Sequence, residues 1–311
     1  MSMTADAALV TSAREAMATR FEIALHGDDS VRLRAAAGEA LDEITRLEGM
    51  LSLYEPTSEI AHCNQRASQK PVPVSAEVFN LLKRCQKLTA KTIGAFDITI
   101  APLMQCWRFI GNTGGRPSGD EIESALQNVG MCWVELNEAN TTVRFRRQGV
   151  MLDMGSIGKG YALERASALL EENEFTDFLI HGGTSTVCAR GTQPDGSPWR
   201  IAIEHPDNGK PPLHIVELHN EALSVSGIGG KSFLDADGNE QGHVIDPHTG
   251  HPTQSAKVSA VIHADATSSD ALATALLTKG AALLSQLPAN TRALTASMVE
   301  EQLVVQTQHL Y

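Results

Sequence analysis

The stretch LDMGSIGKGYALERA, from Leu152 to Ala166, is the feature that most constrains how this chain folds. It places three glycines and a lysine between an aspartate and a run of residues with helical spacing. The pattern predicts a strand ending at Asp153, a tight glycine turn and a helix beginning near Gly160. Free N–H groups in the turn and at the helix N-terminus favour an anion such as phosphate. Lys159 is expected to add a positive charge there.

Two well-known phosphate-binding patterns do not fit this stretch. A Walker-type loop requires glycine where this chain has Asp153, and serine or threonine where it has Gly160. A dinucleotide-binding fingerprint requires a third glycine where this chain has Leu163. The alternative is a purely structural turn from strand to helix with a solvated Lys159, and the local pattern alone favours that alternative.

Other candidate residues for chemistry lie far apart in the sequence. Asp270 and Thr274 are four residues apart in a predicted helix, so both oxygens share one face, as suits Mg²⁺; alternatively, Asp270 caps that helix. His243, in GHVIDPHTG, can serve as a base at neutral pH, or is a loop residue packed on the prolines. In GAFDITIAPL, Phe96 is expected in the core and Asp97 in a turn or a helix cap.

The pattern of elements predicts an α+β fold with a mixed, mostly antiparallel sheet and packed helices. Predicted strands outnumber predicted helices, and several neighbouring strands lie at hairpin distance. Ser30 and Ser75 are expected to cap two of the helices, and Glu77 lies in the first turn of the second. Residues 1–15 are small and polar, and are expected to form a flexible tail.

The charge and cysteine content exclude several classes of function. The chain has 25 basic and 37 acidic residues and a formal charge of −12, which disfavours nucleic acid and anionic lipid as partners. The five cysteines form no CxxC pair, so neither a zinc ribbon nor a thioredoxin-type site is indicated. No secretion signal and no membrane-spanning run is apparent. We therefore expect a cytoplasmic protein, or a periplasmic one if a leader has been removed.

Nine short segments, taken together and in order, resemble the ApbE family of FAD:protein FMN transferases. They are MATRFEI, LSLYEPTSEI, GAFDITIAPL, LDMGSIGKGYA, FLIHGGTSTVCARG, WRIAIEHP, SVSG, GHVIDPHTG and SDALATALL. The resemblance implies one flavin transferase domain over residues 16–311, with the ApbE (T-fold-like) architecture.

The resemblance also implies an activity and a set of site residues. The expected reaction is Mg²⁺-dependent transfer of FMN from FAD to a threonine hydroxyl of a target protein, with release of AMP. His243 is implied as the base or as the residue that positions the acceptor. The residues implied to contact FAD are Met17, Tyr54, Ala95, Phe96, Asp97, Asp153, Lys159 and Ile245. Those implied to hold Mg²⁺ are the Ser156 backbone carbonyl, Asp270 and Thr274.

The resemblance implies that the acceptor is a separate protein, typically a redox subunit. Family targets carry a sequence of the type Asp-Gly-x-Ser/Thr-Gly-Ala-Thr, which does not occur in this chain. Two alternatives remain open on the residues alone. One is a pyrophosphatase that hydrolyses FAD to FMN and AMP, and the other is a protein that binds FAD without catalysis.

Overall fold

The computed structural model describes residues 8–111, 114–230, 232–235 and 237–310. Its central element is an eight-stranded sheet with the order β1-β2-β6-β7-β10-β13-β14-β15, in which every neighbouring pair is antiparallel. The strands are β1 (Ala8–Ala16), β2 (Thr19–Gly27), β6 (Phe178–Gly182), β7 (Thr186–Arg190), β10 (Ala222–Gly227), β13 (Val258–His263), β14 (Arg292–Val299) and β15 (Gln302–Gln308).

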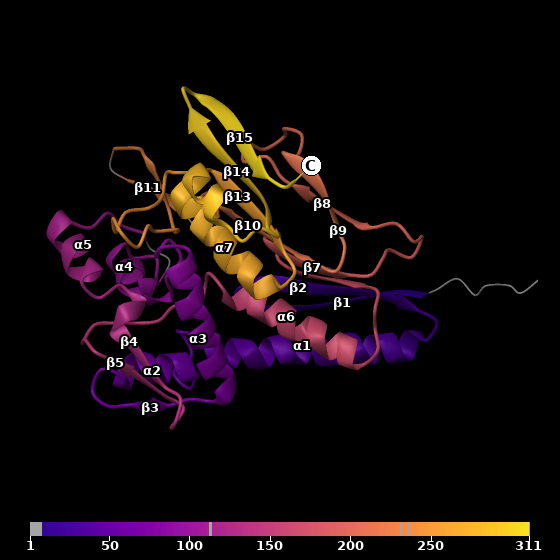
Figure 1. Ribbon diagram of the computed structural model, residues 1–311, viewed down its shortest axis with the longest axis horizontal. Helices are drawn as coiled ribbons and strands as arrows, with labels where there is room; N and C mark the ends of the chain where they lie inside the picture. The colour runs from indigo at the N-terminus through magenta and orange to yellow at the C-terminus, as the bar shows by residue number, and fades with distance from the viewer. Residues whose placement is uncertain (1–7, 112–113, 231, 236, 311) are drawn as a thin grey trace, which may run out of the picture.

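Both faces of this sheet are covered. Three helices, α1 (Ser30–Leu51), α6 (Gly158–Glu172) and α7 (Ala266–Lys279), lie on one face (Figure 1). A two-stranded ribbon of β8 (Trp199–Ile203) and β9 (His214–Leu218) packs on the other face through its buried apolar side chains. Burial of apolar area on both faces is the main favourable term that holds these layers together.

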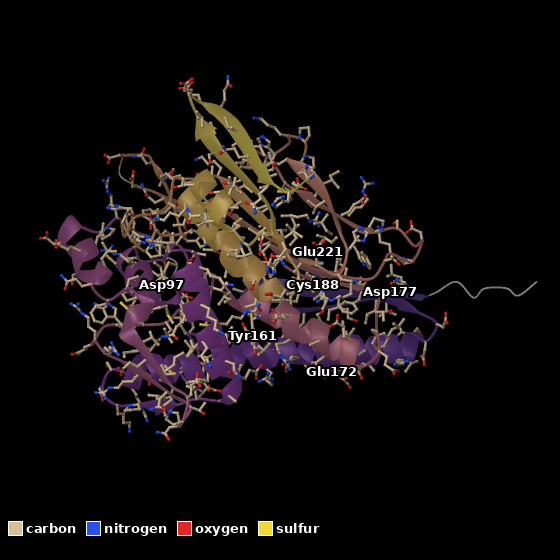
Figure 2. The ribbon with its side chains drawn as sticks, in the orientation of Figure 1. Asp97, Tyr161, Glu172, Asp177, Cys188 and Glu221 are labelled. Atoms are coloured by element: carbon tan, nitrogen blue, oxygen red, sulfur yellow. The ribbon has the colours of Figure 1, made fainter. Side chains whose placement is uncertain are left out.

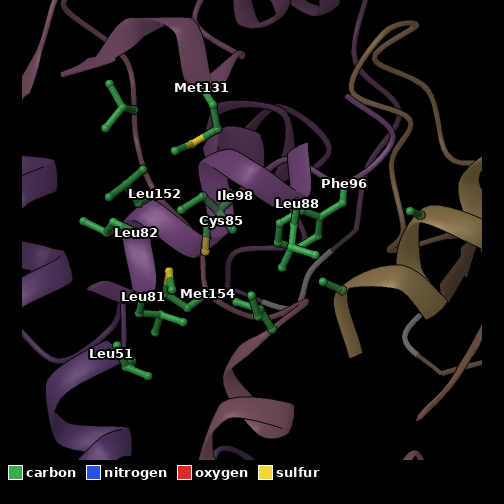
Figure 3. Close-up of a cluster of buried hydrophobic side chains, with 14 of the residues drawn as sticks. Leu51, Leu81, Leu82, Cys85, Leu88, Phe96, Ile98, Met131, Leu152 and Met154 are labelled. Carbon is green, nitrogen blue, oxygen red and sulfur yellow. The ribbon is translucent and has the colours of Figure 1, made fainter. Parts of the chain in front are cut away.

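The remaining elements form a second cluster beside α7 (Figure 1). Its core is an apolar group in which side chains of α3, such as Leu82 and Cys85, meet Phe96 and Leu152 (Figure 3). Buried residues of α7 belong to the same group, so α7 joins this cluster to the main sheet. The further elements are α2 (Glu59–Arg66), α3 (Ala76–Lys91), α4 (Ala101–Cys106), α5 (Gly119–Leu126), β3 (Val72–Pro73), β4 (Val134–Asn137), β5 (Thr142–Phe145), β11 (Ser232–Leu234), β12 (Glu240–Gly242) and the 3-10 turns η1 (Ile98–Ile100), η2 (Met131–Trp133) and η3 (Gly280–Gln286).

The predicted α+β class is confirmed, and the helix α3 begins as expected. The Ser75 hydroxyl accepts the Val78 N–H at 3.2 Å, and Glu77 lies in the first turn. Every strand pair in the described part of the chain is antiparallel, so the sheet is not mixed. No helix in that part of the chain is long and apolar enough to cross a membrane.

Three local predictions were wrong. Residues 8–15 of the expected tail belong to β1, while residues 1–7 lie outside the described residues. Helix α1 is capped by Asp29 and not by Ser30, because the Asp29 carboxylate accepts the N–H groups of the next turn. The segment before the glycine turn, residues 150–154, forms no strand.

Candidate functional site

The glycine turn and α7 are in direct contact, although more than 100 residues separate them. Helix α6 begins at Gly158, and the N–H of Gly160 donates a hydrogen bond to Asp270 Oδ2 at 2.9 Å. Gly160 is required by this contact, because a Cβ there would lie 2.3 Å from the Ala266 carbonyl oxygen. Ser156 lies four residues before Gly160, in the turn that leads into α6. The predicted metal-binding helix therefore crosses α6 at the glycine turn.

Asp270 is a buried carboxylate, 5% exposed, that forms no ion pair among the described residues. The cap of α7 is Asp265, so the alternative role of Asp270 as a helix cap is wrong. The Thr274 hydroxyl lies one turn further along the same helix and is 3.4 Å from the Ser226 hydroxyl. A buried carboxylate is costly unless a positive charge lies beside it, and no Lys, Arg or His among the described residues forms an ion pair with Asp270. Its oxygens, together with the neutral hydroxyl oxygens nearby, form a donor set that fits Mg²⁺.

This donor set contains only one carboxylate, so a metal ion would need further ligands from outside the set. Among the residues that the structure describes, no group of three or more His, Cys, Asp or Glu side chains could hold a metal ion. Mg²⁺ usually keeps few protein ligands and completes its shell with water and substrate phosphates. The site therefore fits a cation that arrives with, or is completed by, a phosphorylated substrate.

The segment at Asp153 is fixed by hydrogen bonds on both sides. The Asp153 N–H donates to the Ile98 carbonyl at 2.7 Å, and Asp153 Oδ1 accepts the Gly155 N–H at 2.8 Å. The Asn64 side-chain amide forms two hydrogen bonds with the backbone of the preceding residue, Leu152. Its oxygen accepts the Leu152 N–H at 2.7 Å, and its nitrogen donates to the Leu152 carbonyl at 2.9 Å. These bonds replace the strand that the sequence suggested, and they place the turn beside the segment that contains residues 95–97.

Asp97 is committed to bonds within the protein. Its carboxylate is 7% exposed and accepts hydrogen bonds from the Thr99 N–H and hydroxyl and from the Met131 N–H. It caps η1, as one of the two sequence interpretations expected, and it lies beyond the end of α3 (Figure 2). Burial raises the pKa of Asp97, while these hydrogen bonds act in the opposite direction.

Ala95 and Phe96 point into the core and not into solvent. Their exposed fractions are 2% and 1%, and both belong to the cluster that contains Leu88 and Ile98 (Figure 3). A ligand can therefore meet this segment mainly through its backbone. Contact of FAD with Ala95, Phe96 and Asp97 stays a prediction.

Tyr54 and Met17 differ in their surroundings. The Tyr54 side chain is 62% exposed, and partial burial together with the Asp153 charge raises the pKa of its hydroxyl. Contact of FAD with Tyr54 stays a prediction. Met17 has a positive φ of 49°, and its N–H donates to Glu48 Oε1 at 2.6 Å. The Met17 side chain packs on the same apolar cluster as Tyr161 of α6.

Lys159 is half-buried in the first turn of α6 and forms no ion pair within the described part of the chain. Its charge is therefore not neutralised by a protein carboxylate. A phosphate at the glycine turn would find the Lys159 cation beside the positive end of the α6 dipole. The N–H groups of Gly158 and Gly160 already donate to the Met154 carbonyl and to Asp270.

His243 and Ile245 lie on the loop that follows β12. The His243 ring meets the Phe109 ring edge-on, with 6.5 Å between centroids, and Ile245 is 4% exposed in the apolar cluster around Trp107. The role of His243 as a base stays a prediction. His248, further along the same loop, reaches Gly94 and so joins this loop to residues 95–97.

Three residues near the site were not identified from the sequence. Ser226 stands beside Thr274, Asn64 holds the Asp153 segment, and His248 is hydrogen-bonded to Asp246. Ser226 and Asn64 are far along the chain from the residues that they contact, whereas His248 and Asp246 are two residues apart. Only the short spacing of Asp246 and His248 was a local signal that could have been found.

A hollow of about 770 Å³ lies elsewhere, over β4 and β5. Its walls include Gln86, Cys132, Arg144 and Arg146, and none of the predicted site residues lines it. The position of this hollow therefore does not coincide with the predicted site residues.

The cap of α7 makes a testable contribution to stability. Burial alone would raise the pKa of the Asp265 carboxyl. Hydrogen bonds from His263 and the Ser268 N–H, together with the charge of Arg84, nevertheless hold this pKa well below its usual range. Glu164, from α6, pairs with the same Arg84. A carboxylate whose pKa is depressed by folding stabilises the protein above about pH 4, the unfolded pKa, and this stabilisation is lost at lower pH.

We expect Asp265→Asn to lower the free energy of unfolding at pH 7 by about 1 kcal/mol, because asparagine keeps the cap but loses the charge that is paired with Arg84. The difference from wild type should shrink as the pH falls below about 4, because the wild-type carboxylate is then increasingly protonated. Urea unfolding at pH 7, 5, 4 and 3 measures this, with exposed Asp28→Asn as the control. A difference that stays constant over this range would contradict the assignment.

Comparisons with known proteins show the family of this chain and support its fold. The family model described as "ApbE family" matches residues 17–296. The FAD:protein FMN transferase of Escherichia coli (strain K12) is 27% identical over 270 residues, covering 85% of this chain and 76% of that protein. A crystal structure of the ApbE protein from Thermotoga maritima has a TM-score of 0.88 at 27% identity, covering 97% of both chains. The apo flavinyl transferase ApbE of Pseudomonas stutzeri gives a TM-score of 0.85 at 26% identity, covering 100% of this chain and 97% of that one.

Proposed function

This chain belongs to the ApbE family of FAD:protein FMN transferases, and we propose that it moves FMN from FAD to a threonine hydroxyl of an acceptor protein with the help of Mg²⁺. One observation carries the metal-dependent part of this proposal. The Asp270 carboxylate is buried, has no protein cation and is hydrogen-bonded to the turn where a phosphate is expected. A diphosphate with a divalent cation satisfies both the carboxylate and the turn.

The residues divide the binding task by charge. Asp270, Thr274 and the Ser156 carbonyl would hold Mg²⁺, which supplies neutralisation of the diphosphate charge during transfer. Lys159 and the positive end of the α6 dipole would attract the phosphate oxygens. Tyr54 would cover a flat ring of FAD from the exposed side.

The transfer itself is a displacement at phosphorus. The acceptor threonine oxygen forms a bond to the phosphorus of the FMN half, and the bond from that phosphorus to the bridging oxygen breaks. AMP leaves with the bonding electron pair, and the product is a phosphoester of FMN. We assign the threonine proton to His243, because a positioned base is needed for a neutral hydroxyl to attack.

Incubation of the full chain with FAD, Mg²⁺ and an acceptor that carries the Asp-Gly-x-Ser/Thr-Gly-Ala-Thr sequence tests this proposal. Mass spectrometry of the acceptor should show the mass gain of FMN, and AMP should appear in equal amount. An acceptor with valine in place of the target threonine should gain no mass. His243→Ala should slow the transfer by roughly 100-fold or more while FAD still binds.

Two outcomes would favour the alternatives. AMP released equally fast without an acceptor would identify a hydrolase, in which water replaces threonine. FAD that binds and stays intact with both Mg²⁺ and acceptor present would identify a binding protein.

A further inference from the structure

Arg84 lies where helices α3, α6 and α7 meet, and each of these helices leads to a segment of the proposed site. Arg84 of α3 donates to Glu164 Oε1 of α6 at 2.8 Å and also bonds the Asp265 carboxylate at the start of α7. Its Nη2 is 3.2 Å from the Ser268 hydroxyl. The Arg84 and Glu164 side chains are 27% and 31% exposed, so solvent screens this group only in part.

Each of the three helices carries a different part of the site. Helix α3 leads into residues 94–97, α6 follows the glycine turn at residues 153–159, and α7 carries Asp270 and Thr274. A guanidinium forms its bonds in a fixed planar fork, so it sets the distance and angle between the groups that it contacts. Few other side chains could hold all three elements at once.

The crossing of α6 and α7 is fixed at two levels. On the site side, Gly160 N–H bonds Asp270. One helical turn away, Glu164 Oε2 accepts both the N–H and the hydroxyl of Thr267. Arg84 holds the other oxygen of the same Glu164 carboxylate. A change at Arg84 is therefore transmitted through Glu164 to the helix on which Asp270 sits.

We propose that Arg84 is a positioning residue for the metal site: by joining Glu164 to the start of α7, it sets the position of Asp270 against the glycine turn. This inference rests on the proposed function, because it concerns the cation that function requires. Arg84 does not touch the metal. Its effect on Mg²⁺ affinity is exerted through the spacing of α6 and α7.

Mg²⁺ binding to the full chain in the presence of FAD, measured by titration calorimetry without any acceptor, tests the proposal. Arg84→Met keeps most of the apolar stem and removes the fork, and it should raise the Mg²⁺ dissociation constant roughly 10-fold. Arg84→Lys should recover thermal stability more than Mg²⁺ affinity, because an ammonium cannot bond two carboxylates in the same geometry. Thr267→Val removes the hydrogen bond from the Thr267 hydroxyl to Glu164, and it should also raise the Mg²⁺ dissociation constant. In the double variant with Arg84→Met, the two effects should not be additive.

The matched control is Arg146→Met. Arg146 pairs with Glu135 at 2.7 Å on the small sheet, outside the site, so its loss should leave the Mg²⁺ dissociation constant unchanged. Arg84→Met with lowered thermal stability but wild-type Mg²⁺ affinity would overturn the inference and leave the proposed function standing. Wild-type protein that binds Mg²⁺ and FAD but transfers no FMN would contradict the proposed function alone. Wild-type protein that binds no Mg²⁺ would contradict both.

Discussion

Asp270→Asn is expected to lower Mg²⁺-dependent FMN transfer by at least about 100-fold, because the loss of metal-assisted charge neutralisation costs several kcal/mol in the transition state. The free energy of unfolding should stay within about 1 kcal/mol of wild type. The asparagine carbonyl can still accept the Gly160 N–H, which Asp270 accepts at 2.9 Å. The substitution therefore removes the charge and keeps the hydrogen bond. Transfer rates at increasing Mg²⁺ and urea unfolding of the same preparations measure the two effects.

The alanine variant separates the two roles of Asp270. Asp270→Ala should lose transfer to the same extent and also lose roughly 1–3 kcal/mol of stability, because it leaves the Gly160 N–H buried without an acceptor. Ser226→Ala is the comparison at the edge of the site, since Ser226 lies 3.4 Å from Thr274 and is not a proposed ligand. Normal Mg²⁺-dependent turnover in Asp270→Asn would show that the metal is held elsewhere.

Gly160→Ala should destabilise the protein by about 3 kcal/mol, the upper end of the range for an overpacked core. The added methyl carbon would lie 2.3 Å from the Ala266 carbonyl oxygen and 2.6 Å from Asp270 Cβ. Both neighbours belong to α7, so the helices must separate, and the Gly160 bond to Asp270 must lengthen. We therefore also expect a large loss of Mg²⁺ affinity, measured by calorimetry together with thermal unfolding.

Gly158→Ala is the internal control two residues earlier. A Cβ at Gly158 would meet only Met154 Cβ, at 3.9 Å, which is an ordinary contact. Alanine has the higher helix propensity, so this variant should be as stable as wild type or slightly more stable. If both glycines tolerated alanine equally, the close crossing of α6 and α7 would not exist in solution.

The sequence allowed prediction of features that depend on neighbouring residues. Ser75 and Glu77 predicted the start of α3, because capping involves only the first turn. The four-residue spacing of Asp270 and Thr274 likewise placed both on one helix with no further information. The family resemblance then supplied the site residues that the local patterns left open.

The features that could not be predicted depend on contacts between distant residues. Among residues 9–16 of the edge strand β1, only Val10 and Ala16 are buried hydrophobic residues, so the apolar alternation was too weak to recognise. Helix α2 has eight residues, too few for a clear helical period. The Gly160–Asp270 bond spans 110 residues, and no local spacing indicates that the two meet.

Helix α7 has buried residues on every side, and these residues contribute to the core of the main sheet and to the cluster around α3. A helix enclosed in this way cannot slide or unwind without opening both cores, so it acts as a fixed frame for the oxygen atoms that it carries. Any movement that admits a large protein partner and later releases it must therefore come from the surface loops, such as the one between β12 and β13, while the proposed metal-binding face of α7 stays still.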